Sequence, residues 1–587
     1  MSWLLFFISL FLVSCGGKDV RMGETERKVM VVPNSYILGL WDQESMSKGL
    51  LQRDKSLFSF ARIEQIGEAS AFGVHDRRND SFFSQPPPEN NGSLALFRVD
   101  LHQDVDSQAF LDKLDHKVVA IWEPNRLNHL FSKKKIAVGS PNIVKNLQAP
   151  YLKNNNFFEG FYERYEEVGG YWWLDAIRMG EVYQALGQRD LDALPDDKLA
   201  ALAPVIAILD SGIDYQHPAL SGKIWINPTP GLAGCENDEY GCDTTASSRF
   251  PLGKGPAIPF GTKAVGESCP VETVQGQTFL NGACIHGTHV AGLIVANDEY
   301  GVAGVCPQCK VLSIKVVENI DGEGKVPDSA ILKGLKYVQN INKMHGGIVK
   351  LVNSSFGKFE QSLSVSLVVK ELMATGVVVV GASGNENTTE RVFPAALDEV
   401  IAVTALSREG KKASYSNFGT WISLSAPGGD VEFGSRSDEA IVSTVPGGDI
   451  YLSQGTSVAT PLVTGVAGLI QMLEPDLQGW LLRQRLLGSA DRKLYDIDFA
   501  GGYNNSYGPK HGLESVPGLL GRGMLDGNAA YLGELTQEDE LTPSERVPPQ
   551  CGEIIMKKRG DAPSLLVLIF FYLMPIILLG VRRGEVP

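Results

Sequence analysis

The middle of the chain alternates predominantly apolar runs with amphipathic stretches. Short apolar runs are typical of strands buried on both faces of a sheet, and they cover residues 205–209, 311–317, 348–354, 376–381 and 400–404. Apolar residues at helical spacing lie between them, over 328–343 and 363–375. A turn is expected over Asp321-Gly322-Glu323-Gly324, before the first of these helices. This order predicts an α/β fold: a doubly wound, mostly parallel sheet with helices on both faces and a functional site at the carboxyl ends of the strands.

The pattern near the N-terminus is different. Strands are predicted over 29–32, 36–40, 94–99 and 118–122, and a short helix over 107–114. These elements predict a small α+β unit that spans residues 29–130. Residues 131–170, which are basic, then Asn-rich, then aromatic, form a linker before the α/β region.

A serine lies among small residues in the segment Gly455-Thr456-Ser457-Val458-Ala459-Thr460-Pro461. An Ala-, Gly-, Val- and Leu-rich run follows, and proline is tolerated in the first turn of a helix. We therefore predict a loop that delivers Ser457 to the N-terminus of a buried helix, where the helix dipole favours negative charge. The motif alone fits an N-cap serine on a core helix, and it also suits a nucleophile whose attack creates an oxyanion.

Two more polar residues lie at the ends of predicted elements. Asp210 ends the apolar run that starts at Val205, and His286 opens a second small-residue helix. An Asp that orients an imidazole, a His that takes a proton and a Ser that attacks are the groups that acyl transfer requires. Their order along the chain, Asp–His–Ser, is the order found in subtilisin.

The sequence resembles the subtilisin-like (subtilase) serine endopeptidases over about residues 170–532. The resemblance rests on four motifs: Asp210-Ser211-Gly212-Ile213-Asp214, His286-Gly287-Thr288-His289-Val290-Ala291-Gly292, Gly384-Asn385 and the Ser457 segment. It implies a catalytic domain over 171–533 that hydrolyses peptide bonds through an acyl-enzyme, with Asp210, His286 and Ser457 as the catalytic triad. It also implies protein or peptide substrates and no cofactor for the chemistry.

The resemblance assigns further residues to the site. Asn385 would donate to the oxyanion, although a turn Asn after a strand is the alternative reading of Gly384-Asn385 alone. The substrate groove would be lined by Gly322, Gly324, Ser355, Phe356, Gly357, Ala382, Ser383 and Gly384. Phe356 is larger than the residues common at its position and is expected to narrow the pocket. His217 and His289 are expected to be structural. The 29–130 unit resembles the family's pro-domain, which assists folding and inhibits the enzyme; an unrelated N-terminal domain is the alternative.

Composition limits the function classes further. The chain has 587 residues, 43% of them hydrophobic, which fits a globular protein of more than one domain. Its formal net charge of -15 argues against a nucleic-acid partner.

Six of the eight cysteines lie within one loop-rich region, which points to disulfides in an oxidising compartment. Six cysteines allow fifteen pairings. Proximity in the sequence favours Cys235–Cys242, Cys269–Cys284 and Cys306–Cys309. For the last pair, a redox motif or half of a metal site is the alternative.

Four of these cysteines lie in an insertion of about residues 227–284, between Asp210 and His286. We expect a disulfide-stapled surface loop near the rim of the site, either shaping substrate access or without a function of its own. Its acidic residues match no defined calcium loop, so a structural calcium is possible but unassigned, and no metal ligand is named. They are Glu236, Asp238, Glu239 and Asp243.

Both ends of the chain carry apolar runs. Residues 1–15 resemble a bacterial lipoprotein signal with Cys15 as the lipidated residue, although no basic residue precedes the run; an ordinary signal peptide is the alternative. A polar tether follows over 16–28. After an acidic, Pro-containing linker with a basic flank (534–563), residues 564–581 are apolar and just long enough to span a bilayer. Basic residues on both sides, including the tail 582–587, leave the orientation of this segment open, and a cleaved sorting signal fits equally.

These features predict an exported serine endopeptidase of the bacterial cell envelope, attached to the membrane at one or both ends. The anchoring and the insertion favour a restricted processing role over broad digestion. A catalytically silent surface-binding module on a protease scaffold is the alternative from another class. It would be expected to have a broken triad or a blocked cleft, and all four key residues are present in the sequence.

Overall fold

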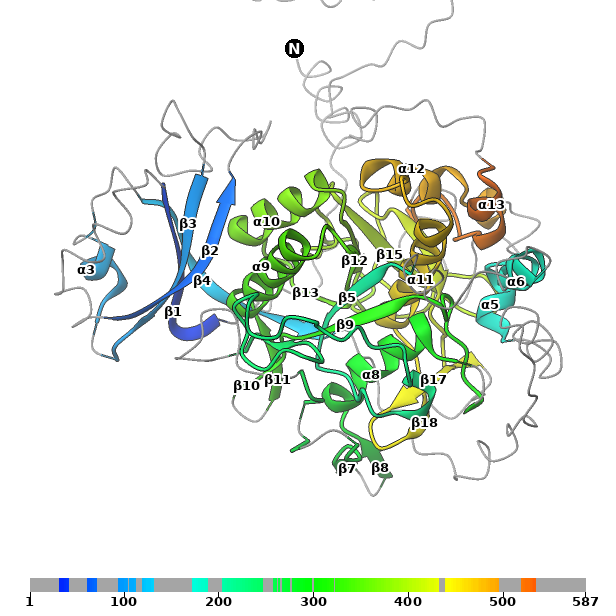
Figure 1. Cartoon of the computed structure of the whole chain (residues 1–587), viewed down its shortest axis with the longest axis horizontal. Helices are drawn as coiled ribbons and strands as arrows, with labels where there is room; N and C mark the ends of the chain where they lie inside the picture. The colour runs from blue at the N-terminus through cyan, green and yellow to red at the C-terminus, as the bar shows by residue number, and fades with distance from the viewer. Residues whose placement is uncertain are drawn as a thin grey trace, which may run out of the picture. The chain divides into compact units, whose positions relative to one another are not determined.

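The computed structural model shows a parallel α/β sheet preceded by an antiparallel region (Figure 1). It describes residues 31–41, 61–70, 93–130, 171–187 and 203–534, with gaps at 104, 112–113, 115–118, 246–256, 261, 264–265, 275–276, 298–299, 321–322, 432–438 and 496–518. The predicted signal, tether, linker 131–170, C-terminal apolar segment and basic tail lie outside these residues, as do Cys15 and Gly322.

Seven parallel strands form the central sheet, in the order β16-β15-β14-β12-β5-β9-β6. Their bounds are β5 Val205–Asp210, β6 Cys242–Asp243, β9 Lys310–Lys315, β12 Val349–Ser354, β14 Val378–Ala382, β15 Val400–Leu406 and β16 Leu424–Pro427. The order reverses along the chain on either side of β5, as a doubly wound fold requires. The predicted fold class is therefore confirmed.

Helices cover both faces of this sheet (Figure 1). The main ones are α8 Gly282–Val295, α9 Asp328–Met344, α10 Leu363–Ala374 and α11 Thr456–Leu473; the smaller ones are α5 Trp172–Ala176, α6 Met179–Gly187, α12 Trp480–Gly488 and α13 Gly527–Leu532. Successive side chains of a strand point to opposite faces. In β5, Ile206 and Ile208 accordingly join the core beneath α8 and α11, while Ala207 and Leu209 join the core beneath α9 and α10.

The N-terminal region forms an antiparallel sheet with one short helix. Its elements are β1 Val31–Trp41, β2 Ala61–Ser70, β3 Ser93–Leu101, α3 Ser107–Leu111 and β4 Val119–Leu130. One face packs on α9 and α10, where Ile66 and Leu96 share a buried cluster with residues of both helices. Lys333 of α9 also forms an ion pair with Glu64 of β2, with 2.8 Å between Nζ and Oε1.

Strand β4 connects the N-terminal sheet to the α/β region. Its first part pairs with β1, and its last four residues lie between two strands of the α/β region. Leu127 and Asn128 pair antiparallel with β11 (Glu323–Pro327), which itself forms a hairpin with β10 (Glu318–Ile320). His129 and Leu130 pair antiparallel with β13 (Phe356–Gly357). The end of β4 is thus an added strand between β11 and β13.

Three sequence expectations need correction. Strand β2 was not predicted, because a bulge between Gln65 and Gly67 breaks the alternation of its apolar residues. Strand β4 was expected to end near residue 122, before Pro124; it continues because β1 is its one described neighbour there, and proline is tolerated at such an edge. Glu323 and Gly324, expected in a turn, belong to β11.

Two small antiparallel hairpins complete the described elements: β7 Val271–Val274 with β8 Gln277–Leu280, and β17 Ile441–Val445 with β18 Asp449–Ser453. In the described ranges, α11 alone has the length and hydropathy to cross a bilayer, and 94% of it is buried within the protein. Its apolar character therefore reflects its place at the centre of the core.

Candidate active site

Asp210 ends β5 at the carboxyl edge of the central sheet, as predicted. Its side chain is buried, and its Oδ1 accepts a hydrogen bond from the backbone N–H of Ser211 at 2.7 Å. The chain then turns at Gly212, whose φ of 95° lies in the region that glycine adopts freely. This turn keeps the carboxylate at the end of the strand.

His286 lies in the second turn of α8, not at its start. The helix begins at Gly282 because Asn281 caps it: the Asn281 side chain accepts from the backbone N–H of Cys284 at 3.0 Å. The next residue, Gly287, lies so close to the loop after β5 that an added Cβ would overlap the carbonyl oxygen of Gly212. Glycine at this position lets the helix bring His286 up to Asp210.

The imidazole of His286 and the carboxylate of Asp210 are in direct contact. Nδ1 of His286 lies 2.7 Å from Oδ1 and 2.9 Å from Oδ2 of Asp210. A carboxylate accepts, so Nδ1 carries the proton and Nε2 presents its lone pair. Among the described residues Nε2 is buried and has no hydrogen-bond partner. The pair therefore offers a basic nitrogen of fixed orientation.

Ser457 lies in the first turn of α11, with 1% of its surface exposed. The helix begins at Thr456, so Pro461 falls in the second turn, later than predicted. A proline there has no N–H to donate to the carbonyl oxygen four residues earlier, which is that of Ser457. This oxygen accepts instead from Oγ of Ser355 at 3.3 Å. The carbonyl oxygen that lacks its helix hydrogen bond thus connects the start of α11 to Ser355, the residue just before β13.

Asn385 follows β14 and is tied to the residue before Ser457. Its Oδ1 accepts from the backbone N–H and from Oγ1 of Thr456, both at 3.0 Å. Oγ1 of Thr456 also accepts from the backbone N–H of Gly384 at 3.1 Å. With Oδ1 held in this way, the orientation of the carboxamide is fixed, and Nδ2 is its donor group. This placement agrees with the predicted role at an oxyanion.

The other two histidines of these motifs have structural partners. Nδ1 of His217 accepts from the backbone N–H of Ala219 at 3.1 Å, and its Nε2 lies 2.8 Å from the Asp449 carbonyl oxygen. Nε2 of His289 lies 3.2 Å from the Tyr451 carbonyl oxygen. Burial lowers the pKa of His289 to about 3, with a smaller contribution from His286, so its imidazole stays neutral.

The end of β4 lies between β11 and β13, and we call the site that it occupies there the groove. Phe356 pairs with Leu130 and Gly357 with His129, and the neighbouring Ser355 contacts Ser457. The Phe356 side chain does not reach into this groove freely, because it is buried in the cluster that contains the α9 and α10 core residues. Phe356 therefore packs in this core, and its narrowing of the substrate pocket stays a prediction.

The remaining predicted groove residues lie around the same strands. Gly324 is in β11, where an added Cβ would crowd Ala283. Ala382 ends β14, and the backbone N–H of Ser383 donates to the Val403 carbonyl oxygen at 3.0 Å. Close packing and strand geometry account for the small residues at these positions.

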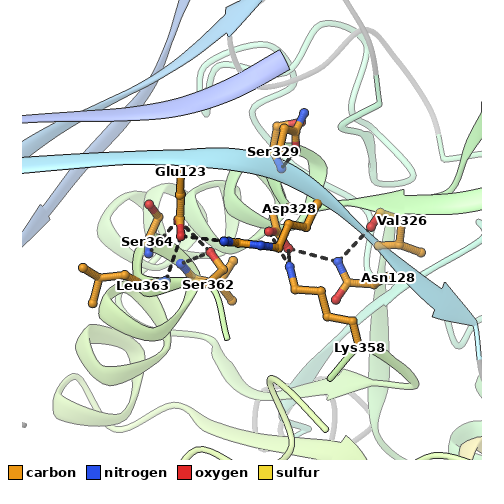
Figure 2. A network of polar contacts seen from close by, with 12 residues as sticks. Glu123, Asn128, Val326, Asp328, Ser329, Lys358, Ser362, Leu363 and Ser364 are labelled. Carbon is orange, nitrogen blue, oxygen red and sulfur yellow. Dashed lines mark hydrogen bonds and ion pairs between the residues drawn. The ribbon is translucent and has the colours of Figure 1, made fainter. Parts of the chain in front are cut away.

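A polar network between β4 and two helices was not predicted (Figure 2). Oε1 of Glu123 accepts from Oγ of Ser362 at 2.9 Å and from the backbone N–H of Ser364 at 3.2 Å, which caps the start of α10. Oδ1 of Asn125 accepts from the backbone N–H of Ser329 at 3.0 Å near the start of α9. Glu123 and Asn125 could have indicated these contacts, because Glu and Asn side chains favour helix N-termini. The sequence did not show which helices they contact.

All three favoured cysteine pairings are confirmed: Cys235–Cys242, Cys269–Cys284 and Cys306–Cys309. The Cys306–Cys309 disulfide is buried, and its formation replaces the metal-site alternative for this pair. A redox motif also forms a disulfide when it is oxidised, so the disulfide itself does not test that alternative. Cys284 lies in α8 two residues before His286, so the second disulfide ties the insertion to the helix that carries His286.

Two of the four acidic residues of the insertion, Asp238 and Asp243, have hydrogen-bond partners within the protein. Asp238 is buried and accepts from the hydroxyl of Tyr337 at 2.6 Å and from Nδ2 of Asn227 at 2.9 Å. Asp243 accepts from the backbone N–H of Thr245 at 3.0 Å. Within the described ranges no group of three or more His, Cys, Asp or Glu side chains is placed to hold a metal ion.

Known proteins share this architecture. Residues 203–511 match the sequence model of the subtilase family. The chain is 35% identical to the thermostable alkaline protease of Halalkalibacterium halodurans over 202 residues, 34% of this chain and 51% of that protease. It is 35% identical to subtilisin BL of Lederbergia lenta over 218 residues, 37% of this chain and 74% of subtilisin BL. Fervidolysin from Fervidobacterium pennivorans has a similar fold, with a TM-score of 0.51 at 21% identity, over 87% of this chain and 62% of fervidolysin.

The fold and the site together define a subtilisin-like α/β protein. The family match covers more than half of the chain, and the chain belongs to the subtilase family. The matched segment spans about half the length of the first of these proteases and about three quarters of the second.

Proposed function

We propose that the protein is a serine endopeptidase that hydrolyses peptide bonds in protein substrates through an acyl-enzyme. The observation that carries this proposal is the buried His286–Asp210 contact, which leaves Nε2 of His286 as a basic nitrogen. Ser457 at the start of α11 supplies the hydroxyl, and the 35% identity to two proteases supports the assignment.

In the proposed reaction, His286 takes the hydroxyl proton of Ser457 while Oγ attacks the carbonyl carbon of the scissile bond. Asp210 stabilises the resulting imidazolium, and Nδ2 of Asn385 donates to the oxyanion. The imidazolium then protonates the leaving amine, and the acyl-enzyme forms. Water attacks the acyl carbon with His286 again as the base, which releases the carboxylic acid and restores Ser457.

The N-terminal sheet is proposed to inhibit the protease until it is removed. Support comes from β4, whose last residues pair with both β11 and β13 and so lie where an extended peptide would add as a strand. A cut within residues 131–170 would release this leader. The helix-capping contacts of Glu123 and Asn125 are consistent with a role in folding of the α9–α10 region.

The protein is further proposed to be exported to the bacterial cell envelope and held at the membrane. Three disulfides support an oxidising compartment. The lipoprotein-like segment ending at Cys15 and the apolar residues 564–581 support attachment to a membrane.

The experiment compares the full chain with its Ser457→Ala variant, using a quenched fluorescent peptide as substrate and intact mass as a second readout. We expect the wild-type chain to cleave the peptide and to lose its N-terminal fragment. The variant should do neither, while keeping the same thermal unfolding transition. Peptide cleavage by purified Ser457→Ala at the wild-type rate would contradict the proposal.

A further inference from the structure

One buried position of the groove is polar, and both apolar and charged side chains surround it. Asn128 is the second of the four β4 residues that lie between β11 and β13, and its side chain is buried. A small cavity adjoins it, lined in part by the apolar side chains of Ile331 and Val365. A carboxamide in such a place needs partners for its donors, because an unsatisfied buried polar group is costly.

Both donors of this carboxamide are satisfied by the catalytic region (Figure 2). Nδ2 of Asn128 donates to the carbonyl oxygen of Val326 at 2.9 Å and to Oδ1 of Asp328 at 3.0 Å. Val326 belongs to β11 and Asp328 is the first residue of α9. The two acceptors therefore stay with the groove when another peptide replaces β4.

The carboxylate of Asp328 is held in place from its other side by Lys358. The Lys358 ammonium group contacts both carboxylate oxygens, and both side chains are almost completely buried. Burial raises the pKa of Asp328 and lowers that of Lys358, so neither charge is favoured without partners. A hydrogen-bond donor on the peptide strand gives the Asp328 carboxylate a further partner, which water cannot supply because the carboxylate is buried.

Asn128 differs from its neighbours in β4 in what it contacts. Glu123 and Asn125 cap helices, which serves the fold. The contacts of Asn128 are to a groove strand and to a buried ion pair beside it. A peptide that binds in the groove in the same register as β4 would therefore place one of its side chains where the Asn128 side chain lies.

We propose that this groove position is a specificity subsite, at which Asp328, held by Lys358, selects peptide substrates with a hydrogen-bond-donating side chain, a carboxamide above all. The inference rests on the proposed peptidase activity, and it adds the class of substrate side chain that the groove selects. An apolar side chain would leave the buried carboxylate short of a partner, and a carboxylate side chain would face Asp328 with like charge.

The first test uses the purified wild-type protein and quenched peptides that copy residues 123–137, so that the register of β4 is kept. The residue at the Asn128 position is varied to Gln, Ser, Leu and Asp, and mass spectrometry checks that the same bond is cut. We expect the Leu and Asp peptides to show a kcat/KM about 10- to 100-fold below that of the Asn peptide, the range expected for a hydrogen bond to a charged group. Ala at the exposed His129 position is the matched control, with a change of less than about threefold.

The second test changes the protein. The double variant Asp328→Leu with Lys358→Met replaces a buried ion pair by apolar side chains of similar size, a change that proteins often tolerate. We expect it to reverse the preference, so that the Leu peptide becomes the better substrate. Thermal unfolding checks that the variant is folded, and the peptide series on the wild-type protein needs no variant at all.

The outcomes separate the subsite from the peptidase activity. Equal kcat/KM for the Asn, Leu and Asp peptides, cut at the same bond, would overturn the subsite and leave the peptidase intact. No cleavage of any peptide, together with no reaction of Ser457 with a fluorophosphonate, would overturn the proposed function and the subsite with it.

Discussion

At the scale of single residues, the site is defined by which polar atoms already have fixed partners. Asp210 holds Nδ1 of His286, and Thr456 holds Oδ1 of Asn385. In each case the anchored atom fixes the orientation of the side chain, and with it the direction of Nε2 of His286 and of Nδ2 of Asn385. These orientations support the proposed base and the proposed oxyanion donor, which lie on two different segments, α8 and the loop after β14.

Replacing Asn385 tests the oxyanion assignment. Asn385→Ala removes the donor and should lower kcat by about 100- to 1,000-fold with little change in KM, because the charge on the oxygen develops only in the transition state. Steady-state kinetics on a quenched peptide measure this. Asn387→Gly is the nearby control, since Asn387 has a φ of 53° that glycine adopts without strain. A similar loss in both variants would contradict the role of Asn385.

His289 predicts how stability changes with pH. Its pKa falls from an ordinary value of 6.5 to about 3 in the folded protein, so between these values the unfolded chain binds the proton and the folded chain does not. Stability must then decrease as pH falls below about 6.5, by about 2 kcal/mol at pH 5 from this group alone. Denaturant unfolding of wild type and His289→Gln across pH 5–8 measures it. The variant should show a weaker pH dependence, and an unchanged pH dependence would refute the assignment.

At the scale of elements, the central sheet was predictable because buried parallel strands leave a simple signal. The run ending at Asp210 and the Gly-Val-Val-Val-Val-Gly segment both became central strands. The favoured cysteine pairs were correct because each joins neighbours in the sequence. The helix carrying His286 starts earlier than predicted because its cap, Asn281, precedes the small-residue motif on which the prediction rested.

The Cys269–Cys284 disulfide makes a prediction at this scale. It closes a loop with a sequence separation of 15, and the Cys306–Cys309 disulfide closes one of 3. Removing the longer crosslink with Cys269→Ser and Cys284→Ser should lower the free energy of unfolding by about 3 kcal/mol, and removing the shorter by about 2 kcal/mol, because a longer loop restricts the unfolded chain more.

Urea unfolding monitored by fluorescence compares these two double variants with the wild type. Peptide hydrolysis should also fall in the first variant and not in the second, since Cys284 lies two residues before His286. A larger loss of stability from the Cys306–Cys309 pair, or full activity without Cys269–Cys284, would contradict this reading of the insertion.

At the scale of the whole molecule, the sequence could not show the tertiary contacts between segments that lie far apart along the chain. Strand β4 reaches β11 and β13 across about 200 residues of sequence, and no local pattern in residues 127–130 indicates these partners. The same applies to the carboxamide of Asn128 and the carboxylate of Asp328. The residues of the proposed triad could be named from the sequence because each lies in its own local motif, whereas the groove contacts depend on the tertiary fold.

The most direct measurement of the central claim is reaction of the purified protein with a fluorophosphonate probe, followed by peptide mapping. The account predicts a single label on Ser457 in the wild-type protein and no label in His286→Ala, while His102→Ala, an exposed histidine of the N-terminal region, labels as the wild type does. Label on another residue, or undiminished label on Ser457 in folded His286→Ala, would contradict it.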